Sequence, residues 1–160
     1  RITRAGRVAL VRDWVWCDLW EAQELLEAFR QEGLGHEGAA RLAELVRGPV
    51  LEGEVFPWAE GEAQRVGRPL WRGLVEAAER LLRQERYEEA CLLAEAARRL
   101  EPLEERPLRT QLRALMALGR RAQAQQAVRA HVRQLRQLLE DEEVELEEET
   151  QQLVRLLEEE

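Results

Sequence analysis

The feature that most constrains this chain is an internal repeat of 34 residues in its C-terminal half. When residues 71–104 are superposed on residues 105–138, the apolar positions coincide. The matched pairs are Leu74 with Leu108, Leu81 with Leu115, and Ala90 with Ala124. A repeat of this length is one supersecondary unit, which buries its apolar face only by stacking on a neighbour. The pattern therefore predicts two stacked units, each a pair of antiparallel helices.

The units resemble the tetratricopeptide repeat. Small side chains at Ala90 and Ala124 would let the second helix of each pair approach the first closely, and Pro102 would close the first unit. The resemblance is incomplete, because the Trp-Leu-Gly-Tyr pattern of the first helix is degraded. His131 also stands where a small residue is expected, and Arg136 stands in place of the closing proline.

The composition extends the helical prediction to the whole chain. Its 160 residues are 45% hydrophobic and 35% charged, rich in Ala, Leu, Glu, Arg and Gln, and contain no Lys, Asn or Ser. These are good helix formers, and the mix excludes a collagen-like or disordered chain. No apolar run approaches the 18 or so residues of a membrane span. We therefore expect one all-α domain of about seven helices.

The N-terminal part differs from the rest. Residues 1–13 hold four arginines and a turn-like Ala5-Gly6, which indicates a short extended or hairpin segment. Since the chain opens on Arg1, we interpret it as part of a longer polypeptide in which residues 1–13 are the remnant of a preceding segment. A first helix is then predicted from Asp18, with Glu21 in capping-box position, to Gly33.

A second helix is predicted over residues 37–47, followed by an ordered apolar loop over residues 48–60 that carries Phe56 and Trp58. The helical pattern resumes over residues 58–84, where Pro69 should kink the helix or split it in two. Most of the five tryptophans are expected to be core anchors, and an exposed subset would mark a self-association surface. Cys17 and Cys91 are expected to be buried free thiols.

Four stretches of the chain, residues 14–29, 47–66, 86–102 and 112–124, resemble the bacterial transcriptional activator domain of antibiotic-pathway regulators and related bacterial regulators. The resemblance covers about residues 14–157 of a domain placed at residues 14–160, and its most specific piece is the loop from Gly48-Pro49 to Pro57-Trp58. It implies a winged-helix DNA-binding domain upstream, whose last strands residues 1–12 would represent. The acidic C-terminal segment, residues 140–160, departs from the family by its high charge and its lack of the usual proline.

The net charge of −8 is unevenly placed. Residues 140–160 hold eleven acids and one Arg, whereas residues 106–139 hold eight Arg and no acid. The repeat register places Arg72, Arg106, Arg109, Arg113 and Met116 on the first-helix face, which lines the groove of a tetratricopeptide pair. The planar guanidinium fork suits carboxylates. This face is therefore a candidate groove for an acidic peptide or for the chain's own residues 140–149. The third alternative is that these side chains are simply solvated and bind no partner. Phe56 and Trp58 are the candidate interaction loop.

No catalytic pattern is evident. The chain has no Ser nucleophile, no phosphate loop, no Cys/His spacing typical of zinc and no calcium-loop glycine in the acidic run. We therefore predict neither enzyme activity, nor a cofactor, metal or small-molecule ligand, nor membrane association. Direct DNA binding by the groove arginines is disfavoured by the net negative charge.

The predicted function is a non-catalytic protein-interaction and oligomerisation module of a cytoplasmic bacterial transcription regulator. Its partners would be a second copy or the transcription machinery, and DNA would be bound only through the upstream domain. The alternative is a free-standing tetratricopeptide scaffold that binds an acidic peptide segment.

Overall fold

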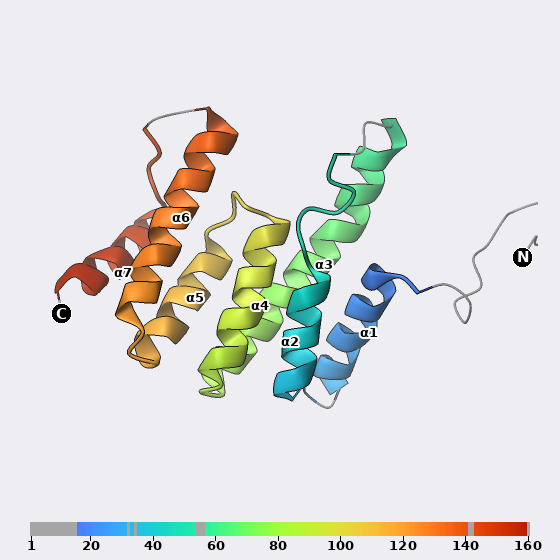
Figure 1. The fold of residues 1–160 in the computed structure, drawn as a ribbon, viewed down its shortest axis with the longest axis horizontal. Coiled ribbons are helices and arrows are strands. Elements are labelled where there is room, and N and C mark those ends of the chain that lie inside the picture. The colour runs from blue at the N-terminus through green and yellow to red at the C-terminus, as the bar shows by residue number, and fades with distance from the viewer. Residues whose placement is uncertain (1–15, 32, 34, 54–56, 141–142, 160) are drawn as a thin grey trace, which may run out of the picture.

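The computed structural model describes residues 16–31, 33, 35–53, 57–140 and 143–159, and the predicted N-terminal segment 1–13 lies outside them. The described residues form seven helices and no strand (Figure 1). The helices are α1 (Asp18–Gln31), α2 (His36–Leu45), α3 (Pro57–Arg83), α4 (Tyr87–Leu100), α5 (Arg106–Ala117), α6 (Arg121–Leu139) and α7 (Glu148–Glu159). The all-α array of helical hairpins is as predicted.

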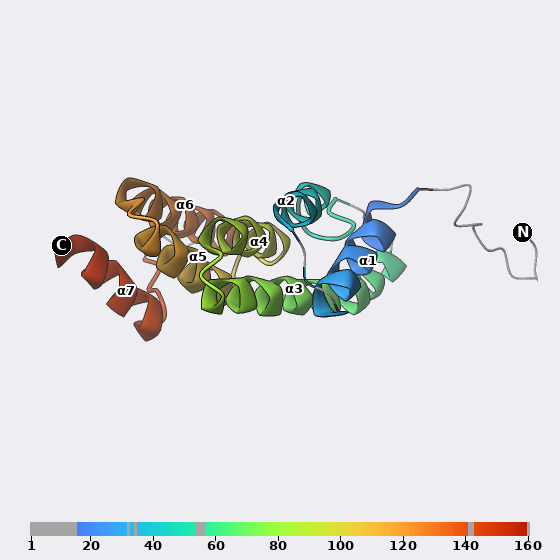
Figure 2. The same ribbon diagram turned by 90° about the horizontal axis from the view of Figure 1, so that it is seen from below.

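The helices stand in two layers. Figure 2 shows α2, α4 and α6 along one side of the array and α1, α3 and α5 along the other, with α7 at the C-terminal end. Helix α4 packs against α2, α3 and α5, and α7 packs against α5 and α6. Each of the first three pairs is therefore a hairpin of a first helix and a second helix, and α7 covers the last hairpin.

The 34-residue repeat is present in the backbone as well as in the core. Leu74, Leu81, Ala90 and their partners Leu108, Leu115 and Ala124 are all buried. The turns between the paired helices also match, because Arg86 N donates to Leu81 O at 3.0 Å and Arg120 N donates to Leu115 O at 2.9 Å. Glu85 and Gly119, again 34 apart, both have positive φ angles, of 59° and 68°. Both hairpins are thus closed by the same left-handed turn.

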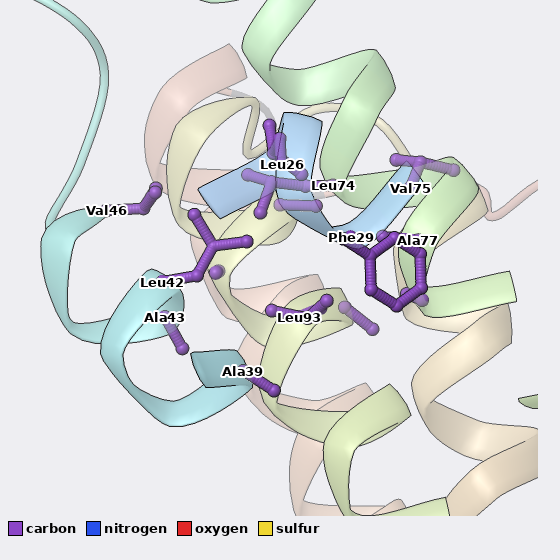
Figure 3. Close-up of a cluster of buried hydrophobic side chains, with 14 of the residues drawn as sticks. Leu26, Phe29, Ala39, Leu42, Ala43, Val46, Leu74, Val75, Ala77 and Leu93 are labelled. Carbon is purple, nitrogen blue, oxygen red and sulfur yellow. The ribbon is translucent and has the colours of Figure 1, made fainter. Parts of the chain in front are cut away.

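Two buried clusters hold the array together. The larger one contains residues of α1, α2, α3 and α4. Figure 3 shows one residue from each of these helices within it: Phe29, Leu42, Leu74 and Leu93. The smaller one joins α5, α6 and α7 through leucines and alanines. At Gly73 a Cβ atom would lie 2.9 Å from Leu26 Cδ1, so an alanine there would displace the end of the Leu26 side chain where α1 approaches α3.

Two local predictions change: the split at Pro69 does not occur, and neither does the capping box at Asp18. Helix α3 runs unbroken through Pro69, so it is not split; Pro69 is exposed, where the ring disturbs no packing. The capping box does not form, because Glu21 accepts hydrogen bonds from Arg41, at 2.7 and 2.9 Å, and from Trp16 Nε1. These bonds lower the pKa of Glu21, that from Arg41 most.

The aromatic and thiol predictions also change. Trp16 and Trp58 are 65% and 60% exposed, and only Trp71 among the described tryptophans packs against the larger core cluster. Cys17 and Cys91 are free, as predicted, but half-buried. The ring nitrogen of the exposed Trp16 donates to the Glu21 carboxylate at 2.6 Å.

A test of the packing is Ala90→Trp. Ala90 has no exposed area, so an indole ring there must separate α4 from its neighbours. We expect the free energy of unfolding to fall by about 3 kcal/mol or more, at the upper end of overpacking effects. Ala122→Trp, on an exposed position of α6, is the matched control and should change stability little. Equal melting of the two variants would contradict the repeat register.

Candidate functional site

The predicted groove arginines lie on α3 and α5, and the structure gives them different partners. Arg106 pairs bidentately with Glu79 of α3, with Nε and Nη2 at 2.7 and 2.9 Å from the carboxylate oxygens. This pairing raises the pKa of Arg106. Arg72 and Arg113 are exposed and form no ion pair with a described residue. Only part of the positive charge on this face is therefore available to a partner.

Arg109 is engaged by the chain's own C-terminal segment. Its side chain is 11% exposed, and Nη1 lies 2.7 Å from a Glu147 oxygen and 3.2 Å from Thr150 Oγ1. Its Nε lies 3.2 Å from Glu149. The Glu105 carboxylate in turn accepts the backbone N–H of Glu147 through both oxygens, at 3.1 Å. Acidic residues just before and within the first turn of α7 thus lie against α5.

Apolar and main-chain contacts also hold α7 against α5 and α6. Met116 packs against the cluster that contains Leu153 and Leu157. Arg121 donates to the carbonyls of Leu156 and Leu157, near the C-terminus of α7, where a cation favours the helix dipole. Of the predicted groove residues, Arg109 and Met116 are therefore covered by this helix.

The predicted interaction loop lies elsewhere. Phe56 is outside the described residues, and the exposed Trp58 is in the first turn of α3. Figures 1 and 2 both place that end of α3 far along the array from α5 and α7. The structure does not bring the loop and the arginines into one site.

A groove of about 740 Å³ lies between the second helices α4 and α6. Its floor comes from α5, and one end reaches α2. The walls combine apolar side chains with glutamines: Cys91, Leu92, Leu115, Gln123, Gln126 and Gln134. We call it the second-helix groove. Burial raises the pKa of the Cys91 thiol to about 11, so this thiol stays protonated at neutral pH.

A largely buried arginine belongs to this groove. Arg98 Nη1 donates to Gln111 Oε1 at 2.7 Å and Nη2 to the Ala127 carbonyl at 3.5 Å, while its buried Nε has no partner. No carboxylate of a described residue forms an ion pair with it, and burial lowers its pKa. His131 next to it is fully buried, and neither ring nitrogen has a partner. Burial, and then the Arg98 charge, lower the pKa of His131 to about 4.

Sequence reasoning missed Arg98 and Gln111 as parts of a site. The one available signal was His131, which occupies the repeat position of Ala97. A bulky polar residue at a small-residue position indicates altered packing there. As predicted, His131 is a packed histidine.

Among the described residues, no three His, Cys, Asp or Glu side chains come together as metal ligands would. No helix in the described ranges is both long and apolar enough to cross a bilayer.

The helical hairpins and the covering helix define this chain as a helical-repeat domain. The model of the bacterial transcriptional activator domain matches residues 17–157. The chain therefore belongs to that family and is a domain of transcription regulation. No curated protein and no solved structure matches the chain significantly.

Buried neutral His131 should make stability depend on pH. Its pKa is about 4 in the folded state, against 6.5 as the ordinary value, so between these pH values the unfolded chain binds the proton and the folded chain does not. Stability is therefore complete above pH 6.5 and falls as the pH decreases towards 4. From pH 7.5 to 5 we expect a loss of about 2 kcal/mol in the free energy of unfolding.

Denaturant titrations at these two pH values test this expectation. His131→Leu should remove most of the pH dependence, while His36→Gln, which removes the exposed histidine, should keep it. An unchanged slope in His131→Leu would mean that another group is responsible.

Proposed function

We propose that this chain is the non-catalytic protein-interaction and oligomerisation module of a cytoplasmic bacterial transcription regulator, and that it acts with a DNA-binding domain upstream of it. The observation that carries the proposal is the family match over residues 17–157, which spans the whole helical array. Stacked helical hairpins present long, rigid faces, which suit partner docking.

Exposed apolar side chains support self-association. Trp58 and Leu51 are large, exposed and close in sequence, at the turn that leads into α3 and at its first turn. Exposed aromatic side chains of this kind are enriched at protein interfaces. We propose that this region joins two copies of the chain.

Mass in solution tests self-association. Sedimentation equilibrium over roughly a hundred-fold range of concentration should give a mass that rises above the 18.6 kDa of one chain. Trp58→Gln should return the mass towards one chain. Leu103→Gln, which removes an equally exposed apolar side chain elsewhere, should leave it unchanged. A constant mass of 18.6 kDa would contradict the oligomerisation role.

The upstream reading frame tests the wider role. A winged-helix pattern that ends near residue 12 would support a transcription regulator. A start codon or an unrelated domain at that position would favour the alternative, a free-standing scaffold for an acidic peptide.

The first-helix face supports a second element of the proposal. Arg109 already holds two carboxylates of the segment around α7, at 2.7 and 3.2 Å. We propose that this acidic segment competes with an acidic partner for the first-helix arginines. Deleting residues 140–160 would also remove Leu153 and Leu157 from the core, so neutralising the two carboxylates is the cleaner experiment.

The variant Glu147→Gln/Glu149→Gln should bind a poly-glutamate peptide more tightly than the parent chain, because Arg109 loses its counter-charges. The affinity should also fall more steeply with salt. Glu158→Gln/Glu159→Gln removes the same charge from exposed positions at the far end of α7 and is the control. Equal gains in both variants would indicate a general effect of net charge and contradict the competition.

A further inference from the structure

We propose that the second-helix groove binds an acidic segment of a partner protein, and that Arg98 pairs there with a carboxylate of that segment. The inference rests on the proposed interaction role and deepens it, because it names a binding site and the chemistry of the partner. The site is distinct from the predicted first-helix face and from the loop around Trp58.

The first argument is the unbalanced charge of Arg98. A largely buried guanidinium is costly unless a carboxylate balances it. The described partners of Arg98 are two neutral oxygens, of Gln111 and of the Ala127 backbone. The fold therefore keeps a desolvated positive charge beside an open groove with no carboxylate in contact with it. Glu95 acts on Arg98 only through space and already pairs with Arg99.

The second argument is that the other cations along the groove are already balanced. Arg120 pairs with Glu88 at 2.6 Å, and Arg99 pairs with Glu95 at 3.1 Å. Arg99 also donates to the carbonyls of Ala43 and Val46, at 2.7 and 3.0 Å. The lining thus has one positive charge in excess, and it is the charge of Arg98.

The third argument is the environment behind Arg98. The neutral ring of His131 is fully buried beside the guanidinium and offers it no counter-charge. The buried Nε of Arg98 and both His131 nitrogens form a cluster of unpartnered polar atoms at one place in the described chain. Clusters of this kind, with shifted pKa values beside a hollow, are typical of binding sites.

The shape of the groove favours a peptide as the occupant. The groove follows α4 from Glu88 to Arg98, a length of roughly 15 Å at the helical rise. Leu92 and Leu115 offer apolar contacts, and the glutamine amides of α6 can donate to and accept from a peptide backbone. An elongated groove with apolar walls and one cation near its end matches an amphipathic acidic segment.

The competing face strengthens this assignment. On the first-helix face, Arg106 is paired with Glu79 and Arg109 with Glu147. Unlike Arg106 and Arg109, Arg98 of the second-helix groove is a desolvated arginine that no described carboxylate contacts. Because desolvated ion pairs are the stronger ones, this cation should dominate the affinity.

The experiment measures binding of a short, fluorescein-labelled, blocked peptide of alternating Glu and Leu to the full chain by fluorescence anisotropy. The parent chain should bind it, and a peptide with Gln in place of Glu should bind at least about ten-fold more weakly. Arg98→Met should weaken binding of the acidic peptide by at least about ten-fold. Arg155→Gln, which removes an exposed arginine of α7 outside both proposed faces, should stay within about two-fold.

A second variant tests the same charge without deleting it. Gln111→Glu places a carboxylate 13 positions from Arg98 in sequence, at the side chain that Arg98 already contacts at 2.7 Å. The internal ion pair should raise Tm and weaken the acidic peptide as strongly as Arg98→Met does. Arg98→Met should melt no lower than the parent, since it removes an unbalanced buried charge. A fall in Tm for Gln111→Glu, or full binding by it, would overturn the inference.

The remaining outcomes separate this inference from the proposed function. Loss of binding in Arg109→Gln but not in Arg98→Met would put the peptide on the first-helix face, which overturns the groove and leaves the interaction role intact. Competition by free glutarate at the peptide's own concentration would indicate a small-anion site and overturn the peptide as ligand. Absence of binding to the parent chain overturns the inference, while mass in solution and the upstream reading frame decide the proposed function independently.

Discussion

The close packing of α4 is the constraint on which the rest of the array depends. This helix contacts α2, α3 and α5, and it can do so because the side chains turned towards its neighbours are small or unbranched at Cβ. Ala90, Ala94, Ala96 and Ala97 have no exposed area. With alanine at these positions, neighbouring backbones approach on several sides at once, and leucines such as Leu93 fill what remains. A helix with larger side chains there would force the neighbouring hairpins apart.

Arginine supplies most of the specific links between the helices. Arg99 of α4 reaches two carbonyls at the end of α2, Arg106 of α5 pairs with Glu79 of α3, and Arg121 of α6 reaches the carbonyls of α7. A planar donor fork can satisfy two acceptors at once, which is why arginine serves this purpose better than lysine would. The chain has arginine and no lysine, so one residue type makes these links between helices and would also serve the proposed recognition of a partner.

Pairing between helices and proposed binding of a partner involve different arginines on the first-helix face and in the second-helix groove. The first-helix face carries more arginines, but carboxylates of α3 and of the segment around α7 balance two of them. The second-helix groove carries fewer free charges, yet Arg98 is desolvated and held by neutral groups. Because a buried, unbalanced charge interacts more strongly than an exposed one, the number of arginines on a face is a poor guide to where a partner binds.

By itself, the sequence determined the helical class, the 34-residue hairpins and the buried positions Leu81, Ala90, Leu115 and Ala124. Those features are set by local propensity and by spacing, which are properties of neighbouring residues. Only the tertiary structure decided which charges are balanced: Arg109 meets Glu147 across 38 positions, and Arg106 meets Glu79 across 27. Spacing along one helix says nothing about partners on another, so the predicted row of arginines divided into paired and exposed members. Arg98 entered the candidate site for the same reason, since only the packing of α4, α5 and α6 withdraws it from water and gives it neutral oxygens as hydrogen-bond partners.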